Sequence, residues 1–284
     1  MKKLIINADD FGLHEAVNSA VITAYKNGCL TSTSIMPSGK AFDNAVRLAL
    51  QNPGLGIGIH LTLVAEMPVS DPIYIQSLVD STGRFAPQYP QFLFRYLIGK
   101  ISLKDIEKEL NAQVQKVVAS GINVTHIDSH QHLHIIPGIL DIVVDIAKKY
   151  NIRAMRIPDE PYFFLGGYPF SLFRILGRTG LTFLAKRARN KIRKTGLLVP
   201  SNFFGMLAGG NMQQQYLANI INNLPNGVSE VMMHPADDAK ALQEIYQWHY
   251  NWDGELLALT SDKIMKLLNN IEIQLVTFGE LTHG

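Results

Sequence analysis

The segment Leu4-Ile5-Ile6-Asn7-Ala8-Asp9-Asp10-Phe11-Gly12 decides the fold, because an apolar run leads directly into two carboxylates. Its first residues have the composition of a buried strand. Asp9 and Asp10 are adjacent at the end of that strand, so their side chains point in different directions. One can therefore ligate a metal while the other faces a substrate. The alternative is a helix N-cap with an acid in the first turn.

Ionisable residues end four further predicted strands in the same manner. They are His60 after Gly56–Ile59, His130 after Val124–Asp128, Arg156 in Ala154–Ile157, and His234 after Val228–Met233. In a parallel barrel, the carboxyl ends of the strands lie at one face, where the active sites of such barrels are built. The sequence therefore predicts that five remote segments meet at one site.

Strand and helix patterns alternate along the chain, which is typical of βα units and a parallel sheet. We predict strands at 4–8, 31–36, 56–62, 124–128, 154–157, 228–233 and 273–277, with a weaker one at 198–204. We predict helices at 15–26, 41–50, 103–119, 138–150, 213–223 and 261–268. This α/β pattern indicates a distorted or incomplete (β/α) TIM-like barrel in one domain, 1–284; a doubly wound open sheet is the alternative.

Two segments interrupt this alternation. Met67–Lys100 is rich in Pro, Gly and aromatic residues, and we expect a loop over the mouth of the barrel. Pro161–Ser201 is expected to be an insertion with a basic helix, 170–194, and no Asp or Glu occurs between Glu160 and Glu230. This helix is either a solvated cap on the barrel or a peripheral membrane contact, since cationic amphipathic helices bind anionic headgroups.

Composition excludes several classes of protein. The 284 residues are 47% hydrophobic, yet no apolar run reaches the length of a membrane span. The single Cys29 cannot form an internal disulfide, so we expect a cytoplasmic protein. The chain carries no nucleophile elbow, Walker-type loop or dinucleotide fingerprint. We expect no nucleic-acid partner, and a homodimer is a further expectation.

The run His126-Ile127-Asp128-Ser129-His130-Gln131-His132-Leu133-His134 holds four imidazoles and a carboxylate. Imidazoles with a carboxylate and one open position form a typical catalytic metal site. The alternative is a solvated, His-rich loop. Not all four histidines can be ligands, so we assign Asp128, His132 and His134 to substrate binding. His60 or His234 alone would be more typical of a core histidine, and Arg156 of an ion pair; beside Asp9 it would orient that carboxylate.

These motifs together resemble the YdjC-like carbohydrate deacetylases, a family that includes the chitooligosaccharide deacetylases. The resemblance is carried by 7–12, 58–61, 126–134, 156–158 and His234-Pro235. Within the family, 30–33, 156–161 and 255–259 are most similar to the hopanoid-biosynthesis-associated branch. The resemblance implies a distorted barrel related to the polysaccharide deacetylases.

The resemblance also implies roles for individual residues. Asp10, His60 and His130 would be metal ligands, Asp9 the catalytic base and His234 the general acid. The cofactor would be a divalent ion, Mg²⁺ or Zn²⁺, and the substrate an N-acetylated carbohydrate or glycolipid. Gln131 stands where the chitooligosaccharide branch often has a third consecutive His, which puts chitobiose as the substrate in doubt.

Two other functions remain open from sequence. Another metal-dependent hydrolase, a phosphoesterase or amidohydrolase, would commonly place a His-x-His on the first strand, where this chain has Asp9-Asp10. A non-catalytic carbohydrate- or lipid-binding protein could retain the same scaffold. The complete set of acid, base and ligands argues against the second alternative.

Overall fold

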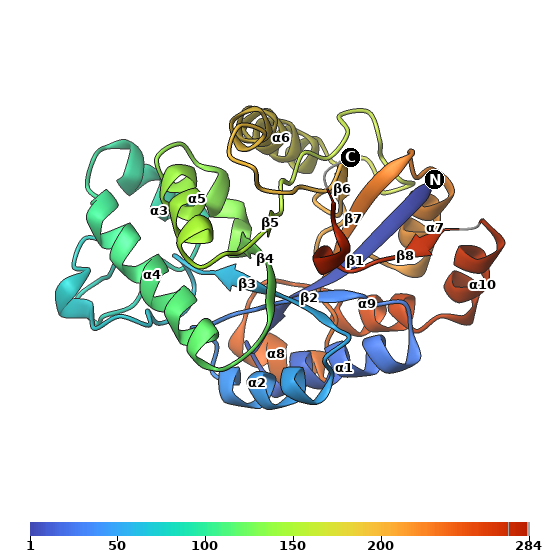
Figure 1. The fold of residues 1–284 in the computed structure, drawn as a ribbon, viewed down its shortest axis with the longest axis horizontal. Helices are drawn as coiled ribbons and strands as arrows, with labels where there is room; N and C mark the ends of the chain where they lie inside the picture. The colour runs from blue at the N-terminus through green and yellow to red at the C-terminus, as the bar shows by residue number, and fades with distance from the viewer. Residues whose placement is uncertain (272, 283–284) are drawn as a thin grey trace.

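A parallel sheet curls around the centre of the molecule in the computed structural model, which describes residues 1–271 and 273–282 (Figure 1). Its strands are β1 (Lys2–Phe11), β2 (Ser32–Ile35), β3 (Gly56–Leu61), β4 (Val124–Ser129), β5 (Ala154–Met155), β6 (Asn202–Phe204), β7 (Gly227–Met233) and β8 (Gln274–Leu275). The order is β5-β4-β3-β2-β1-β7-β6, and β8 pairs with the start of β1. All seven confidently predicted strands are therefore confirmed, although β5 and β8 are shorter than expected.

The weakly predicted strand at 198–204 joins the two edges of this sheet. Leu198 forms a parallel bridge to Ala154 in β5, and β6 pairs in parallel with β7. Because one short segment contacts both edge strands, the sheet closes into a distorted barrel instead of the open, doubly wound sheet. The predicted fold class is thus confirmed.

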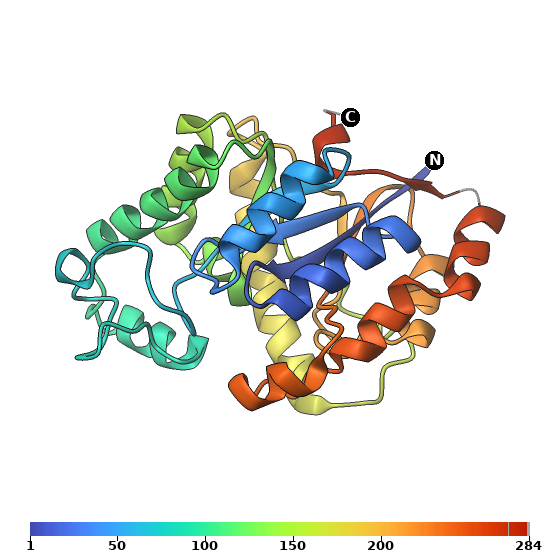
Figure 2. The same cartoon turned by 90° about the horizontal axis from the view of Figure 1, so that it is seen from below.

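Helices surround the strands. They are α1 (Glu15–Asn27), α2 (Phe42–Gln51), α3 (Tyr89–Leu97), α4 (Leu103–Ala119), α5 (Ile139–Lys149), α6 (Leu172–Ile192), α7 (Gln214–Asn222), α8 (Ala239–Ile245), α9 (Trp252–Leu259) and α10 (Asp262–Asn270). Helices α1 and α2 pack side by side over the sheet (Figure 2). No helix in the described part of the chain is long and apolar enough to cross a membrane.

The first of the two irregular segments contains more regular structure than the sequence suggests, and the second contains the helix that was predicted. Segment 67–100 holds a 3₁₀ turn at Pro72–Tyr74 and helix α3. Segment 161–201 holds α6, which lies within the predicted 170–194. Helices α8 and α9 were not predicted, because 239–259 has little amphipathic periodicity between its aromatic residues. The single-domain assignment stays a prediction, and its residues 272 and 283–284 lie outside the described residues.

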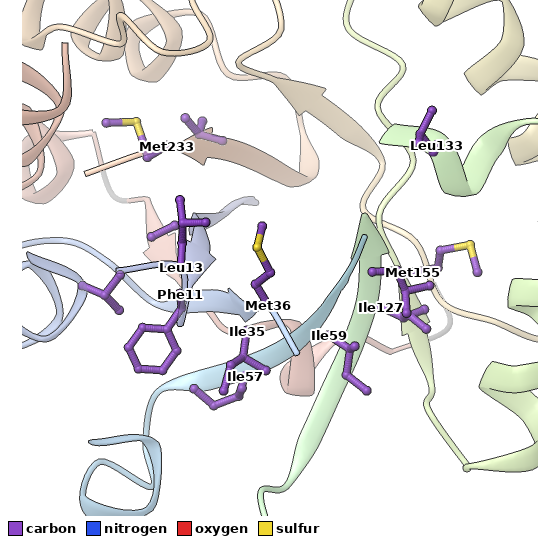
Figure 3. Packing of buried hydrophobic residues seen from close by; sticks show 14 of the residues in the cluster. Phe11, Leu13, Ile35, Met36, Ile57, Ile59, Ile127, Leu133, Met155 and Met233 are labelled. Carbon is purple, nitrogen blue, oxygen red and sulfur yellow. The ribbon is translucent and has the colours of Figure 1, made fainter. Parts of the chain in front are cut away.

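Side chains alternate along each strand between the outer apolar layer and the barrel interior. Ile57, Ile59 and Ile127 belong to the outer layer, where they pack beneath the helices (Figure 3). The residues between them, including Gly58, His60 and Asp128, occupy the inward positions. Near the amino ends of the strands the interior is apolar, with Ile5 among its residues. Towards the carboxyl ends the interior becomes polar, and this part holds the candidate site.

Candidate active site

The end of β1 directs Asp9 and Asp10 to different partners. The pairing of β1 with β2 shifts register between Ala8 and Phe11, and Asp10 adopts a left-handed φ of 65°. A bulge of this kind changes the direction in which a side chain points. The left-handed conformation is strained for a residue other than glycine, and it is found often at functional sites. Asp9 consequently meets Arg156, whereas Asp10 meets His60 and His130.

Asp10, His60 and His130 form a compact, buried group of potential metal ligands. The Oδ1 atom of Asp10 lies 3.4 Å from His60 Nε2 and 3.0 Å from His130 Nδ1. One ligand atom from each residue lies within 4.8 Å of the others. Nε2 of His130 is buried and has no hydrogen-bond partner among the described residues. Two imidazoles and one carboxylate, with room for a further ligand, are the donor set of a catalytic divalent-cation site.

Asp128 holds the ring of His60 in position. The two residues are paired across β3 and β4, and Asp128 Oδ1 lies 2.8 Å from His60 Nδ1. The other carboxylate oxygen accepts a hydrogen bond from Ser34 and forms an ion pair with Arg156, and Asp128 is fully buried. A carboxylate behind an imidazole fixes its tautomer and orientation. Its geometry is therefore that of a support, which differs from the substrate contact expected from sequence.

Arg156 lies at the centre of three buried carboxylates. Its two terminal nitrogens donate to the two oxygens of Asp9 at 2.7 and 2.6 Å, in a bidentate pair. Its Nε donates to Glu230 at 2.6 Å, and Nη1 also lies 2.8 Å from Asp128. Burial raises the pKa of Glu230 to about 8. The pairing of Arg156 with Asp9 matches the sequence expectation, whereas Glu230 was missed.

The remaining histidines of the 126–134 run differ in their surroundings. Both ring nitrogens of His134 have protein partners, Ser129 Oγ at 2.7 Å and the Arg156 carbonyl at 2.9 Å. This arrangement leaves no polar atom for the substrate contact expected of His134. His132 is 8% exposed, its Nδ1 has no partner among the described residues, and its backbone is left-handed with φ 57°. His132 thus remains the member of the run with an unused polar atom.

His126 is a core residue. Its ring stacks on Phe278 at 3.7 Å and hydrogen-bonds Ser34 and Thr125. Gly58 allows this packing, because a Cβ there would lie 2.3 Å from His126 Nε2.

His234 follows β7 beside the end of β1, since Met233 pairs with Ala8. The carboxylate of Glu255 accepts hydrogen bonds from the backbone N–H groups of His234 and Met212. Nδ1 of His234 is buried, and it lies 3.9 Å from Glu255. Glu255, which is fully buried, thereby fixes His234 in place.

The electrostatics of the group favour a positive charge between the ligands. Burial opposes the charged form of His60, but the carboxylates of Asp128 and Asp9 raise its pKa to about 10. The pKa of Asp10 is lowered well below its usual value, because His130 and His60 outweigh the opposing effect of burial. A proton or a cation can supply the favoured charge, so the residues fit a divalent metal ion.

Acid should destabilise the fold through His126. Burial lowers its pKa from 6.5 to about 3. Between these values the unfolded chain binds a proton that the folded protein excludes, so lowering the pH favours unfolding. We expect the stability advantage of the wild type over a His126→Gln variant to fall by about 1.4 kcal/mol per pH unit below pH 6.5. Urea unfolding of both proteins from pH 7 to 5 measures this difference in the free energy of unfolding. The titration of the other buried groups is common to both proteins and drops out of the difference. A constant difference would contradict this account.

Cavities do not locate the site. Two cavities of about 380 Å³ each lie near the amino ends of the strands, one lined by Arg153 and Thr195, the other by Gly56 and Asn123. Neither includes a residue of the polar group at the carboxyl ends. The chemistry of the side chains therefore identifies the site better than the shape of the surface does.

Comparison with known families supports the motif analysis. The family model described as YdjC-like protein matches residues 3–270. The chain belongs to the YdjC-like family. This YdjC-like protein is 34% identical over 280 residues to a carbohydrate deacetylase from Brevibacillus brevis, covering 98% of this chain and 99% of the relative. It is 31% identical over 281 residues to a carbohydrate deacetylase from Thermoanaerobacter pseudethanolicus, covering 99% and 100%.

A solved structure shares the fold of this YdjC-like protein over its whole length. It is a proposed cellobiose-phosphate cleavage protein from Enterococcus faecalis V583, which is 27% identical. The TM-score is 0.80, and the match covers 99% of both chains. The assignment to the hopanoid-associated branch stays a prediction.

Proposed function

We propose that this protein is a metal-dependent hydrolase that removes the acetyl group from an N-acetylated sugar. The observation that carries the proposal is the convergence of Asp10, His60 and His130 beside the Asp9–Arg156 pair. Relatives at 31% and 34% identity over nearly the whole chain are named carbohydrate deacetylases, which supports the same chemistry.

Asp10, His60 and His130 would hold the divalent ion. When bound, such an ion polarises the acetyl carbonyl and makes a coordinated water more acidic. Two imidazoles and a carboxylate suit Zn²⁺, and the carboxylate also admits Mg²⁺. Asp128 holds His60 so that its Nε2, the nitrogen remote from Asp128, faces Asp10.

Asp9 is assigned as the general base. Its Oδ2 lies 4.0 Å from His60 Nε2, so the carboxylate borders the proposed metal position. Arg156 donates to both oxygens, which fixes the orientation of the carboxylate. In this position Asp9 can take the proton of the attacking water, while Arg156 holds the Asp9 carboxylate in a fixed orientation.

His234 is assigned as the general acid. The end of β7 lies beside the end of β1, so His234 and Asp9 follow neighbouring strands. An amine is a poor leaving group until it is protonated, and a protonated imidazole can deliver the proton. Glu255 holds the backbone of His234, and the centroid of the Tyr250 ring lies 5.1 Å from that of the imidazole. His132 is kept as a substrate contact because of its unused Nδ1.

Acetate release tests this function. The metal-supplemented protein is incubated with glycans and glycolipids that contain N-acetylglucosamine, and both acetate and phosphate are measured. We expect acetate release that a chelator abolishes and added metal restores. Phosphate release without acetate would support a phosphoesterase instead. Binding of the sugar with no product would indicate the non-catalytic alternative.

The glycolipid form of the substrate is proposed together with a membrane contact through α6. The helix contains no acidic residue, and its solvent-facing side begins with apolar residues. Phe173 is 83% exposed and Leu176 is 62% exposed, with exposed Phe163 and Phe170 in the preceding segment. Apolar side chains among Lys and Arg are typical of helices that lie on anionic lipid surfaces. The homodimer and the cytoplasmic location stay predictions.

Vesicle co-sedimentation tests the membrane contact. We expect binding to vesicles with phosphatidylserine at low salt and little binding to pure phosphatidylcholine. The Phe173→Ser/Leu176→Ser variant should bind at least about tenfold more weakly, because two apolar side chains no longer enter the lipid. Leu257→Ser on α9, also an exposed leucine, is the control. Equal binding of the two variants would rule out the contact.

A further inference from the structure

A strip of alternating aromatic residues borders the candidate site. In the segment 246–252 the even-numbered residues are aromatic and the odd-numbered residues are polar and exposed. The aromatic rings form a continuous row in which neighbouring centroids lie 4.6 to 5.6 Å apart. The members of the row are Tyr246, Trp248, Tyr250 and Trp252.

Two rings of this row touch residues of the proposed machinery. The Trp248 ring lies 5.1 Å from the ring of His130, a proposed metal ligand. The Tyr250 ring lies 5.1 Å from that of His234, the proposed acid. The middle of the row thus spans the distance between the metal ligands and the proton donor.

The row is held in place at its far end. Asn251 donates its backbone N–H to the Gly210 carbonyl at 2.7 Å. Gly210 must lack a side chain, because a Cβ there would lie 2.2 Å from the Tyr250 ring. Trp252 is 1% exposed and anchors the start of α9 in the core. A rigid aromatic surface binds a ligand with little loss of conformational entropy.

Packing explains the ends of the row but not its middle. Tyr246 is 9% exposed and Trp252 is 1% exposed, so both are core residues. Trp248 and Tyr250 stay only half-buried, although they lie beside a polar site.

We infer that Trp248 and Tyr250 form the stacking wall of a sugar subsite beside the proposed metal ligands and the proposed acid. This inference rests on the proposed function and names the residues that would select the sugar. The acetamido nitrogen is attached directly to a ring carbon, so a sugar whose carbonyl reaches the metal site must place its ring beside that site. The C–H faces of a pyranose are apolar and match an aromatic surface, whereas its hydroxyls need a few placed polar groups.

Tryptophan fluorescence tests the wall, because the chain has two tryptophans. The probe is N,N′,N″-triacetylchitotriose, and an Asp9→Asn background slows its turnover during the titration. In this background Trp252→Phe leaves Trp248 as the reporter, and Trp248→Phe leaves the core Trp252. We expect the sugar to change the emission of the first protein and not of the second. Trp248→Ala should raise Kd about tenfold, as the loss of one stacking contact implies.

The outcomes separate this inference from the proposed function. No emission change from Trp248 at millimolar sugar, or an unchanged Kd in Trp248→Ala, overturns the wall. If the wild type nevertheless releases acetate and Trp248→Ala keeps its KM, the function stands without the wall. If the sugar binds through Trp248 but the wild type releases no acetate, the wall stands and the deacetylase proposal fails.

Discussion

Replacing Asp9 with Asn should lower the rate of acetate release by about 10²–10⁴-fold, the usual contribution of a general base. An amide has nearly the shape of the carboxylate but cannot accept the proton of the attacking water. Asn still offers one oxygen to Arg156, which remains paired with Asp128 and Glu230. We therefore expect a folded variant with normal metal content and a low kcat, measured by steady-state kinetics and elemental analysis.

Asp10→Asn is the matched control for that experiment. The neighbouring residue carries the same functional group but contacts His60 and His130. Its replacement should reduce metal affinity, so that excess metal restores part of the activity, whereas metal cannot rescue Asp9→Asn. An Asp9→Asn protein that turns over at the wild-type rate would remove the base from this assignment.

Replacing Arg156 with Met should destabilise the fold by about 3–5 kcal/mol, the cost of removing one partner from a buried ionic network. Arg156 is fully buried, is the counter-charge of Asp9 and Asp128, and donates a hydrogen bond to Glu230. Met fills much of the same volume, so the loss is mainly one of charge. Urea unfolding at pH 7 measures the change in the free energy of unfolding.

A second substitution in the same background tests the cause. Asp9→Asn removes one of the carboxylates left without a partner, so Arg156→Met/Asp9→Asn should be more stable than Arg156→Met alone. Non-additivity of this kind is expected only for residues in one network. An Arg156→Met protein with the wild-type unfolding midpoint would contradict the role of this ion cluster.

The positions of the main site residues follow from the sequence because the strands are parallel. Asp10, His60 and His130 each end a recognisable apolar strand, and parallel strands place their carboxyl ends at one face. The same reasoning cannot predict which carboxylate hydrogen-bonds and orients which metal-ligating histidine. The pairing of His60 with Asp128 depends on the register of β3 and β4, and register is set by packing of the whole sheet.

Glu230 and Glu255 show where sequence reasoning stops. Glu230 lies inside the buried strand β7, and an ionisable residue in an apolar strand requires a partner. That pattern indicates an ion pair, but only the closed barrel shows that the partner is Arg156. Glu255 acts on His234 from a helix 21 positions later in the chain. No local spacing predicts a contact of that kind.

Anomalous diffraction from crystals of the zinc-loaded protein tests the central assignment most directly. We expect one peak at about 2.0–2.2 Å from a carboxylate oxygen of Asp10 and one ring nitrogen each of His60 and His130, the usual distances from zinc to oxygen and nitrogen ligands. A zinc ion bound elsewhere, with those three side chains uncoordinated, would contradict the proposed reaction centre.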